Sequence, residues 1–142
     1  MAQNAGGERP GGDASKREQW FKEMRTKKHE FLIRELELTS EQQEPFFAIY
    51  DKMDDELKAI NDQTRALERR VSKKADATDA EYDAAIEAVY SQRYREWMVE
   101  SQAKEQLSKI LNKRQMLKLK RAEFKFTRAL MKQHRQARDN KK

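Results

Sequence analysis

Between residues 46 and 71, uncharged residues recur at alternating intervals of four and three positions, and charged residues fill much of the space between them. This spacing places the uncharged set on one face of an α-helix, as in the seam of a coiled coil. The pattern predicts a long helix whose uncharged face packs against a partner helix: Phe46, Tyr50, Met53, Leu57, Ile60, Thr64, Leu67 and Val71.

A helix is also predicted before this segment. Ser15 and Glu18 have the spacing of a capping box, in which a side chain and a backbone amide bond reciprocally at a helix start. The residues before it are polar and rich in glycine, so residues 1–13 are expected to form a disordered leader. The helix that follows is expected to reach about Glu37, with an apolar side made of Trp20, Phe21, Met24, Phe31, Leu32 and Leu36.

Two more helices are predicted after the seam. A capping box at Thr78 and Glu81 predicts a helix from about residue 79 to residue 110. Its partner face is expected to begin with Tyr82, Ile86 and Val89. The last helix is expected to begin after Asn112 and to fray into a basic tail, residues 137–142.

Composition restricts the fold class. All four glycines lie at or before Gly12, so the long remainder of the chain has no glycine for the turns that β-hairpins need. Charged residues make up 39% of the 142 residues and apolar ones 37%, which favours slender helices around a thin core. We therefore predict an all-α fold of four helices with a long bent helical hairpin, forming a single domain over residues 14–136.

The helices are joined by two similar corners. Leu38, Thr39 and Gln42 form the pattern Leu-Thr-x-x-Gln, in which threonine caps the next helix and glutamine bonds back to it. Leu111, Asn112 and Gln115 repeat the pattern with asparagine in place of threonine, and asparagine is also a good N-cap. Both motifs are predicted to end one helix and start the next.

This pair of corners, with a helical hairpin between them, resembles the Spy/CpxP family and its paired LTxxQ motifs over residues 21–130. The resemblance implies a cradle-shaped, intertwined homodimer in the bacterial periplasm. It further implies an ATP-independent holdase chaperone that binds unfolding client proteins on a basic and apolar concave surface. Alternatively, it implies a CpxP-like regulator of an envelope-stress sensor or a metal-responsive periplasmic protein. The start of the chain then reads as a mature N-terminus with an added Met1, its signal peptide absent.

A client-binding surface requires exposed aromatic or methionine side chains with cationic ones nearby. The candidates are Tyr90, Arg93, Tyr94, Trp97 and Met98, with Lys118, Arg121 and Lys125 as a further basic supply. Burial in a core or a dimer interface is the alternative for the aromatic residues, and a solvated surface is the alternative for the basic ones.

Residues for enzymatic chemistry are scarce. The chain has no cysteine, and no glycine follows Gly12 to form a phosphate-binding loop. Two histidines, His29 and His134, are too few for a recognisable metal motif. We therefore predict no enzymatic activity, no cofactor and no metal site. Residues 108–142 carry a net charge of +11, but their basic residues surround the helix, so nucleic-acid binding remains a weaker alternative beside a helical scaffold.

Overall fold

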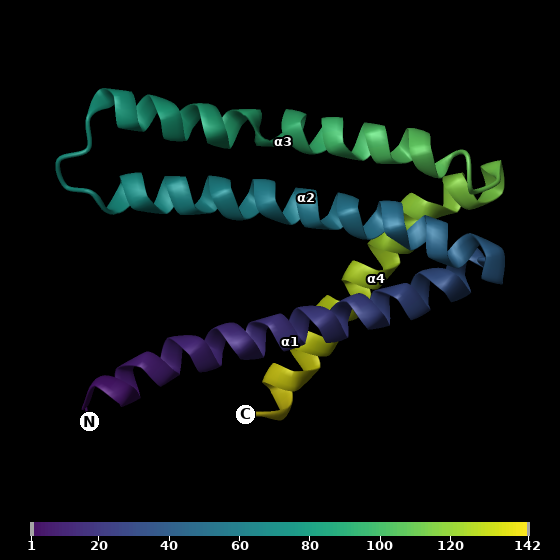
Figure 1. The fold of residues 1–142 in the computed structure, drawn as a ribbon, viewed down its shortest axis with the longest axis horizontal. Coiled ribbons are helices and arrows are strands. Elements are labelled where there is room, and N and C mark those ends of the chain that lie inside the picture. Colours follow the sequence, from purple (N-terminus) through teal and green to yellow (C-terminus); the bar gives the residue numbers. More distant parts are fainter. Residues whose placement is uncertain (1, 142) are drawn as a thin grey trace. The chain divides into compact units, whose positions relative to one another are not determined.

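The computed structural model describes the backbone of residues 2–141 and the side chains of residues 14–141. The described chain forms four helices: α1 (Ala2–Leu36), α2 (Ser40–Lys73), α3 (Asp79–Leu107) and α4 (Lys113–Asn140) (Figure 1). Residues 2–141 contain no strand, which confirms the predicted all-α fold of four helices.

The predicted starts of α2, α3 and α4 are confirmed, whereas the start of the first helix is not. α1 begins at Ala2, so Ser15 lies inside this helix and the helix start predicted at Ser15 is wrong. The prediction of a disordered leader falls on residues 1–13, whose side chains lie outside the described residues, and it stays a prediction.

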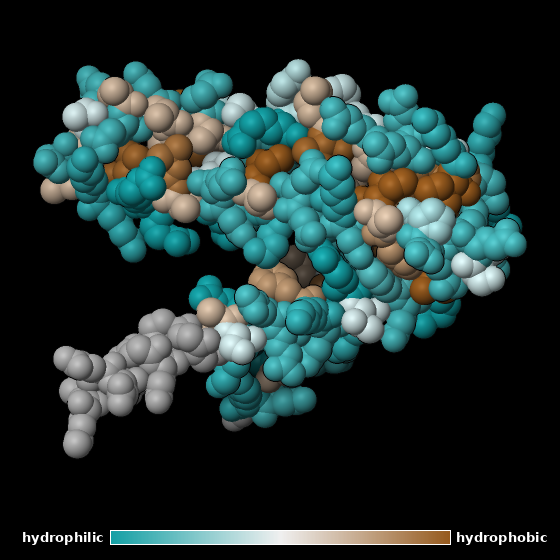
Figure 2. All heavy atoms as spheres, in the orientation of Figure 1, coloured by the Kyte–Doolittle hydropathy of each residue, from teal (hydrophilic) through white to brown (hydrophobic). Residues whose placement is uncertain are grey.

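The chain divides into two compact units, Ser40–Met116 and a second unit made of Met1–Thr39 with Leu117–Lys142. In the first unit, α2 and α3 lie side by side as an antiparallel hairpin (Figure 1). Figure 2 shows hydrophobic residues in a row between these two helices, with hydrophilic residues on either side. Every predicted seam residue of α2 is buried or half-buried, which confirms the predicted seam.

The face that α3 turns toward α2 differs from the prediction. Tyr82, Ile86 and Val89 were expected there, but these side chains are exposed. The buried residues of α3 are Ala85, Ala103 and Leu107. Small side chains let two helix backbones approach closely, so the larger apolar residues of α3 remain on the outer side.

Polar side chains complete the contact between α2 and α3. Arg95 Nη2 donates hydrogen bonds to Thr64 Oγ1 at 3.1 Å and to the Ala88 carbonyl at 2.8 Å. Gln92 Nε2 donates to Asn61 Oδ1 at 3.3 Å. The uncharged Thr64 in the α2 seam therefore faces a hydrogen-bonding partner rather than an apolar one.

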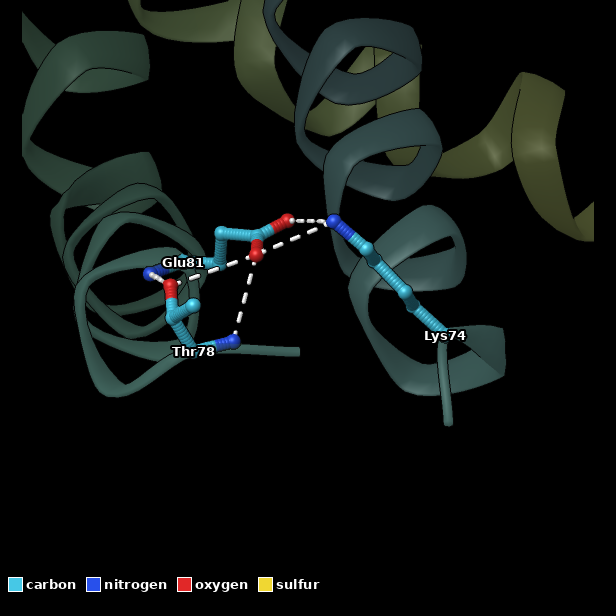
Figure 3. Close-up of polar contacts among 3 residues, drawn as sticks. All are labelled: Lys74, Thr78 and Glu81. Atoms are coloured by element: carbon cyan, nitrogen blue, oxygen red, sulfur yellow. Dashed lines mark hydrogen bonds and ion pairs between the residues drawn. The ribbon is translucent and has the colours of Figure 1, made fainter. Parts of the chain in front are cut away.

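The turn of the hairpin is closed by the predicted capping box (Figure 3). The Glu81 amide donates to Thr78 Oγ1 at 3.2 Å, and Glu81 Oε1 accepts from the Thr78 amide at 3.1 Å. Lys74, just beyond the end of α2, donates to the same carboxylate at 2.9 Å. The hydrogen bond from Lys74 and then the one from the Thr78 amide lower the pKa of Glu81 below its ordinary value.

The second unit holds α1 against α4. The rings of Phe31 in α1 and Phe126 in α4 lie 5.5 Å apart between centroids. Lys125 Nζ forms an ion pair with Glu35 Oε2 at 3.4 Å. The side chains of Leu32, Ala122 and Phe126 are buried, so one side of α4 serves the core and the opposite side faces solvent.

Candidate functional site

The first corner begins with an unusual helix end. The Leu38 amide donates to the Ile33 carbonyl at 3.0 Å, and the Glu37 amide donates to the Arg34 carbonyl at 3.3 Å. These two bonds form a Schellman motif, which requires a left-handed residue after the helix. Glu37 fills that position with φ of 51°, where glycine is usual. Backbone hydrogen bonds and the left-handed conformation of Glu37 therefore end α1. Thr39 follows at the N-cap position of α2.

The second corner contains the capping box predicted from the sequence. The Gln115 amide donates to Asn112 Oδ1 at 2.8 Å, and the Asn112 amide donates to Gln115 Oε1 at 3.0 Å. The Met116 amide then bonds to the Asn112 carbonyl and begins α4. Asparagine thus performs the capping that the motif assigns to threonine. The reciprocal box predicted for Thr39 and Gln42 stays a prediction.

The glutamines of the two corners bond to each other. Gln42 Nε2 donates to Gln115 Oε1 at 2.9 Å, and Gln115 Nε2 donates to Gln42 Oε1 at 2.9 Å. Gln42 Nε2 also donates to the Ile110 carbonyl at 3.1 Å. The two residues are 73 positions apart in the chain, so this amide pair holds the start of α2 against the start of α4.

The corner residues form a structural joint. Leu38 and Leu111 are buried at equivalent positions, one residue before each N-cap. Gln115 is buried, and its amide atoms bond to protein partners. No buried side-chain nitrogen or oxygen in the described chain lacks a hydrogen bond. Neutral amides with satisfied hydrogen bonds supply no acid, base or nucleophile. Their role is to hold the start of α2 against the start of α4.

The α3 candidates form an exposed stripe. Tyr90 is 83% exposed, Tyr94 63% and Trp97 60%, and Met98 and Arg93 also face solvent. Tyr94 and Trp97 stack with ring centroids 6.3 Å apart. Successive helix residues turn by about 100°, so Trp97 lies on the side of α3 opposite Arg95, which bonds to α2. We call this exposed surface of α3 the α3 stripe, and it includes Tyr90, Arg93, Tyr94, Trp97 and Met98 together with three residues nearer the start of the helix.

Three further residues belong to the α3 stripe and were missed as site candidates. Tyr82, Ile86 and Val89 continue the exposed apolar surface toward the start of α3. The sequence contained a signal for them, because alanines at positions 85 and 103 mark another face suited to close helix packing. The α3 stripe therefore comprises Tyr82, Ile86, Val89, Tyr90, Arg93, Tyr94, Trp97 and Met98.

The three basic candidates lie in the other unit. Arg121 and Lys125 are exposed on α4, and Lys118 is half-buried there. Lys125 is paired with Glu35, which offsets part of its charge. Within the α3 stripe itself, Arg93 is the cationic member.

The described residues also bear on two other features, a metal-ligand cluster and a membrane-spanning helix. Among these residues, no group of three or more His, Asp and Glu side chains is placed to hold a metal ion. No helix in the described part of the chain is long and apolar enough to cross a membrane. Comparison with known protein families, with curated proteins and with solved structures finds no match for this chain. The resemblance to the Spy/CpxP family therefore stays a prediction, based on the paired corners and the helical hairpin between them.

Proposed function

We propose that this protein is an ATP-independent holdase chaperone that binds unfolding proteins through the α3 stripe. The exposure of Tyr90, Tyr94 and Trp97 on one side of a helix carries the proposal. Soluble monomers seldom expose a contiguous apolar surface of this kind unless it binds a partner. Aromatic side chains supply large contact area with little loss of side-chain entropy, which suits binding to varied sequences.

Charge supports the same role. Arg93 lies within the α3 stripe, and the chain as a whole carries a net charge of +6. Long-range attraction speeds the approach of acidic unfolded segments, and the aromatic side chains then provide adaptable apolar contact. Neither step requires a bound nucleotide. The resemblance at the two corners extends the proposal to a homodimer in the periplasm.

An aggregation assay tests the proposed activity. The full chain, without ATP, is expected to suppress light scattering by a reduced or heated client at equimolar or lower concentration. The triple variant Tyr90→Ser, Tyr94→Ser, Trp97→Ser removes three exposed rings and is expected to weaken client binding by at least about tenfold. Because these side chains face solvent, helix content by circular dichroism should be unchanged.

Phe124→Ser is the matched control, since it removes an exposed ring from α4 and leaves the α3 stripe intact. It should suppress scattering as the unmodified chain does. Wild-type protein that fails to suppress scattering, or a triple variant as effective as wild type, contradicts the proposal. Light scattering in solution and the native gene's upstream sequence test the homodimer and the periplasmic location separately.

A further inference from the structure

The solvent side of α4 carries a second pattern that the holdase proposal does not use. Leu117 is 82% exposed, Phe124 64% and Met131 60%. These residues recur every seven positions, close to two helical turns, so they line up along one side of α4. Leu119, Ala122 and Phe126 are buried on the opposite side of the same helix. The exposed row is therefore not an edge of the core.

An arginine follows each of these three apolar residues by four positions along α4. Arg121, Arg128 and Arg135 also recur every seven positions, and all three are exposed. The guanidinium carbon of Arg128 lies 5.7 Å from the centroid of the Phe124 ring. Apolar and cationic residues thus alternate at intervals of three or four, with no acidic residue among them. We call Leu117, Arg121, Phe124, Arg128, Met131 and Arg135 the α4 outer face.

A tryptophan of α1 lies beside this face. Trp20 is 46% exposed and packs edge to face on Phe21, with centroids 5.1 Å apart. An open groove of about 510 Å³ runs between Trp20 and α4, and Met131 and Arg135 also line it. The amphipathic indole, with an apolar body and one N–H donor, suits the boundary between water and lipid.

We propose that the α4 outer face binds the surface of an anionic lipid bilayer. Helices that lie in a membrane interface insert leucine, aromatic and similar side chains while arginines and lysines contact lipid phosphates. Leu117, Phe124 and Met131 provide the inserting side chains, and the arginines between them provide the phosphate contacts. Long arginine side chains reach the headgroups while their methylene groups stay in apolar surroundings. The protein would lie on the bilayer without crossing it.

The composition of the face argues against two other partners. Nucleic-acid phosphates would use the arginines but would leave exposed Leu117 and Met131 without an apolar environment. A second copy bound symmetrically through the same face would bring arginines against arginines, because a two-fold contact pairs identical surfaces. An anionic bilayer matches both the charge and the apolar residues.

Vesicle flotation with the full chain tests the proposal. Vesicles of phosphatidylcholine alone are compared with vesicles made of equal parts of phosphatidylcholine and phosphatidylglycerol. The protein is expected to float with the anionic vesicles only, and less at high salt. In a Trp97→Phe background, Trp20 is the one remaining tryptophan, and its emission should shift to the blue on anionic vesicles.

Two triple variants identify the contacts. Leu117→Ser, Phe124→Ser, Met131→Ser removes the inserting side chains, and Arg121→Gln, Arg128→Gln, Arg135→Gln removes the charges. Each is expected to weaken vesicle binding at least about tenfold, with helix content unchanged in circular dichroism. Tyr90→Ser, Tyr94→Ser, Trp97→Ser should still float, which separates this surface from the proposed holdase site.

The results that overturn the proposal are distinct. Absence of binding to anionic vesicles rejects it outright. Binding that only the arginine variant weakens, and that a DNA duplex competes away, assigns the face to a polyanion such as nucleic acid. Binding that both triple variants retain places the lipid contact elsewhere on the chain.

Discussion

The glutamine pair gives the most quantitative test of how the two corners stabilise the fold. Gln42→Met keeps the length of the side chain but removes both bonds to Gln115 and the bond to the Ile110 carbonyl. Gln115→Met removes the same two bonds and the one from the Asn112 amide. At about 1 kcal/mol for each net hydrogen bond, each single variant should lower the free energy of unfolding by about 3 kcal/mol.

The double variant distinguishes coupled from independent residues. It loses the two shared bonds once rather than twice, so the expected total is about 4 kcal/mol and the coupling energy about 2 kcal/mol. Unpaired amide atoms left in each single variant would increase this coupling. Urea denaturation followed by circular dichroism, fitted with a common slope, measures all four proteins.

Gln106→Met is a suitable control, because it makes the same change at an exposed position on α3 and should alter stability by less than about 0.5 kcal/mol. A coupling energy within about 0.5 kcal/mol of zero would show that the paired amides do not join the corners energetically. The reasoning from geometry to stability would then be refuted, even if each single variant were destabilised.

Three further outcomes are expected. Glu37→Gly should raise the free energy of unfolding by up to about 1 kcal/mol, because glycine adopts the left-handed conformation at φ of 51° without strain. A lower free energy of unfolding in urea denaturation would contradict the Schellman assignment. The pKa of Glu81 is lower in the folded protein than in the unfolded chain, so its contacts stabilise the fold at pH values above the unfolded pKa, and this stability is lost as the pH falls through the folded pKa. Glu81→Gln should therefore make the melting temperature fall less steeply with decreasing pH. An unchanged decrease would show that the contacts of Glu81 with Lys74 and Thr78 do not stabilise the fold. Thr64→Val should cost about 1 kcal/mol in urea denaturation by removing a hydrogen bond from Arg95, whereas a gain would mean that this bond is dispensable.

The sequence predicted those features that depend on neighbouring residues. The seam of α2 could be read because a single helix fixes which of its residues share a face. The boxes at Thr78 and Asn112 could be read because a capping side chain reaches only three residues along the chain. The absence of glycine after residue 12 and the high charge likewise indicated slender helices before any contact was known.

The sequence was less informative about which face of α3 meets α2. Tyr82, Ile86 and Val89 looked like partner residues because they are apolar and correctly spaced. In the structure they are exposed, while Ala85 and Ala103 are buried. A helix with apolar residues on two sides offers two acceptable faces, and periodicity alone cannot choose between them. The choice depends on the polar pairing of Arg95 with Thr64 and on the closer approach that alanine permits.

By itself, then, the sequence determined where three of the four helices begin, which residues cap two of them and which side of α2 is uncharged. Tertiary structure alone decided that Gln42 and Gln115 pair across 73 positions, that the aromatic residues of α3 face water and that α4 keeps an arginine-rich face outside its core. The physical reason is the range of the interactions. Caps and periodicity act within one or two helical turns, whereas exposure and long-range hydrogen bonds depend on which helices pack together.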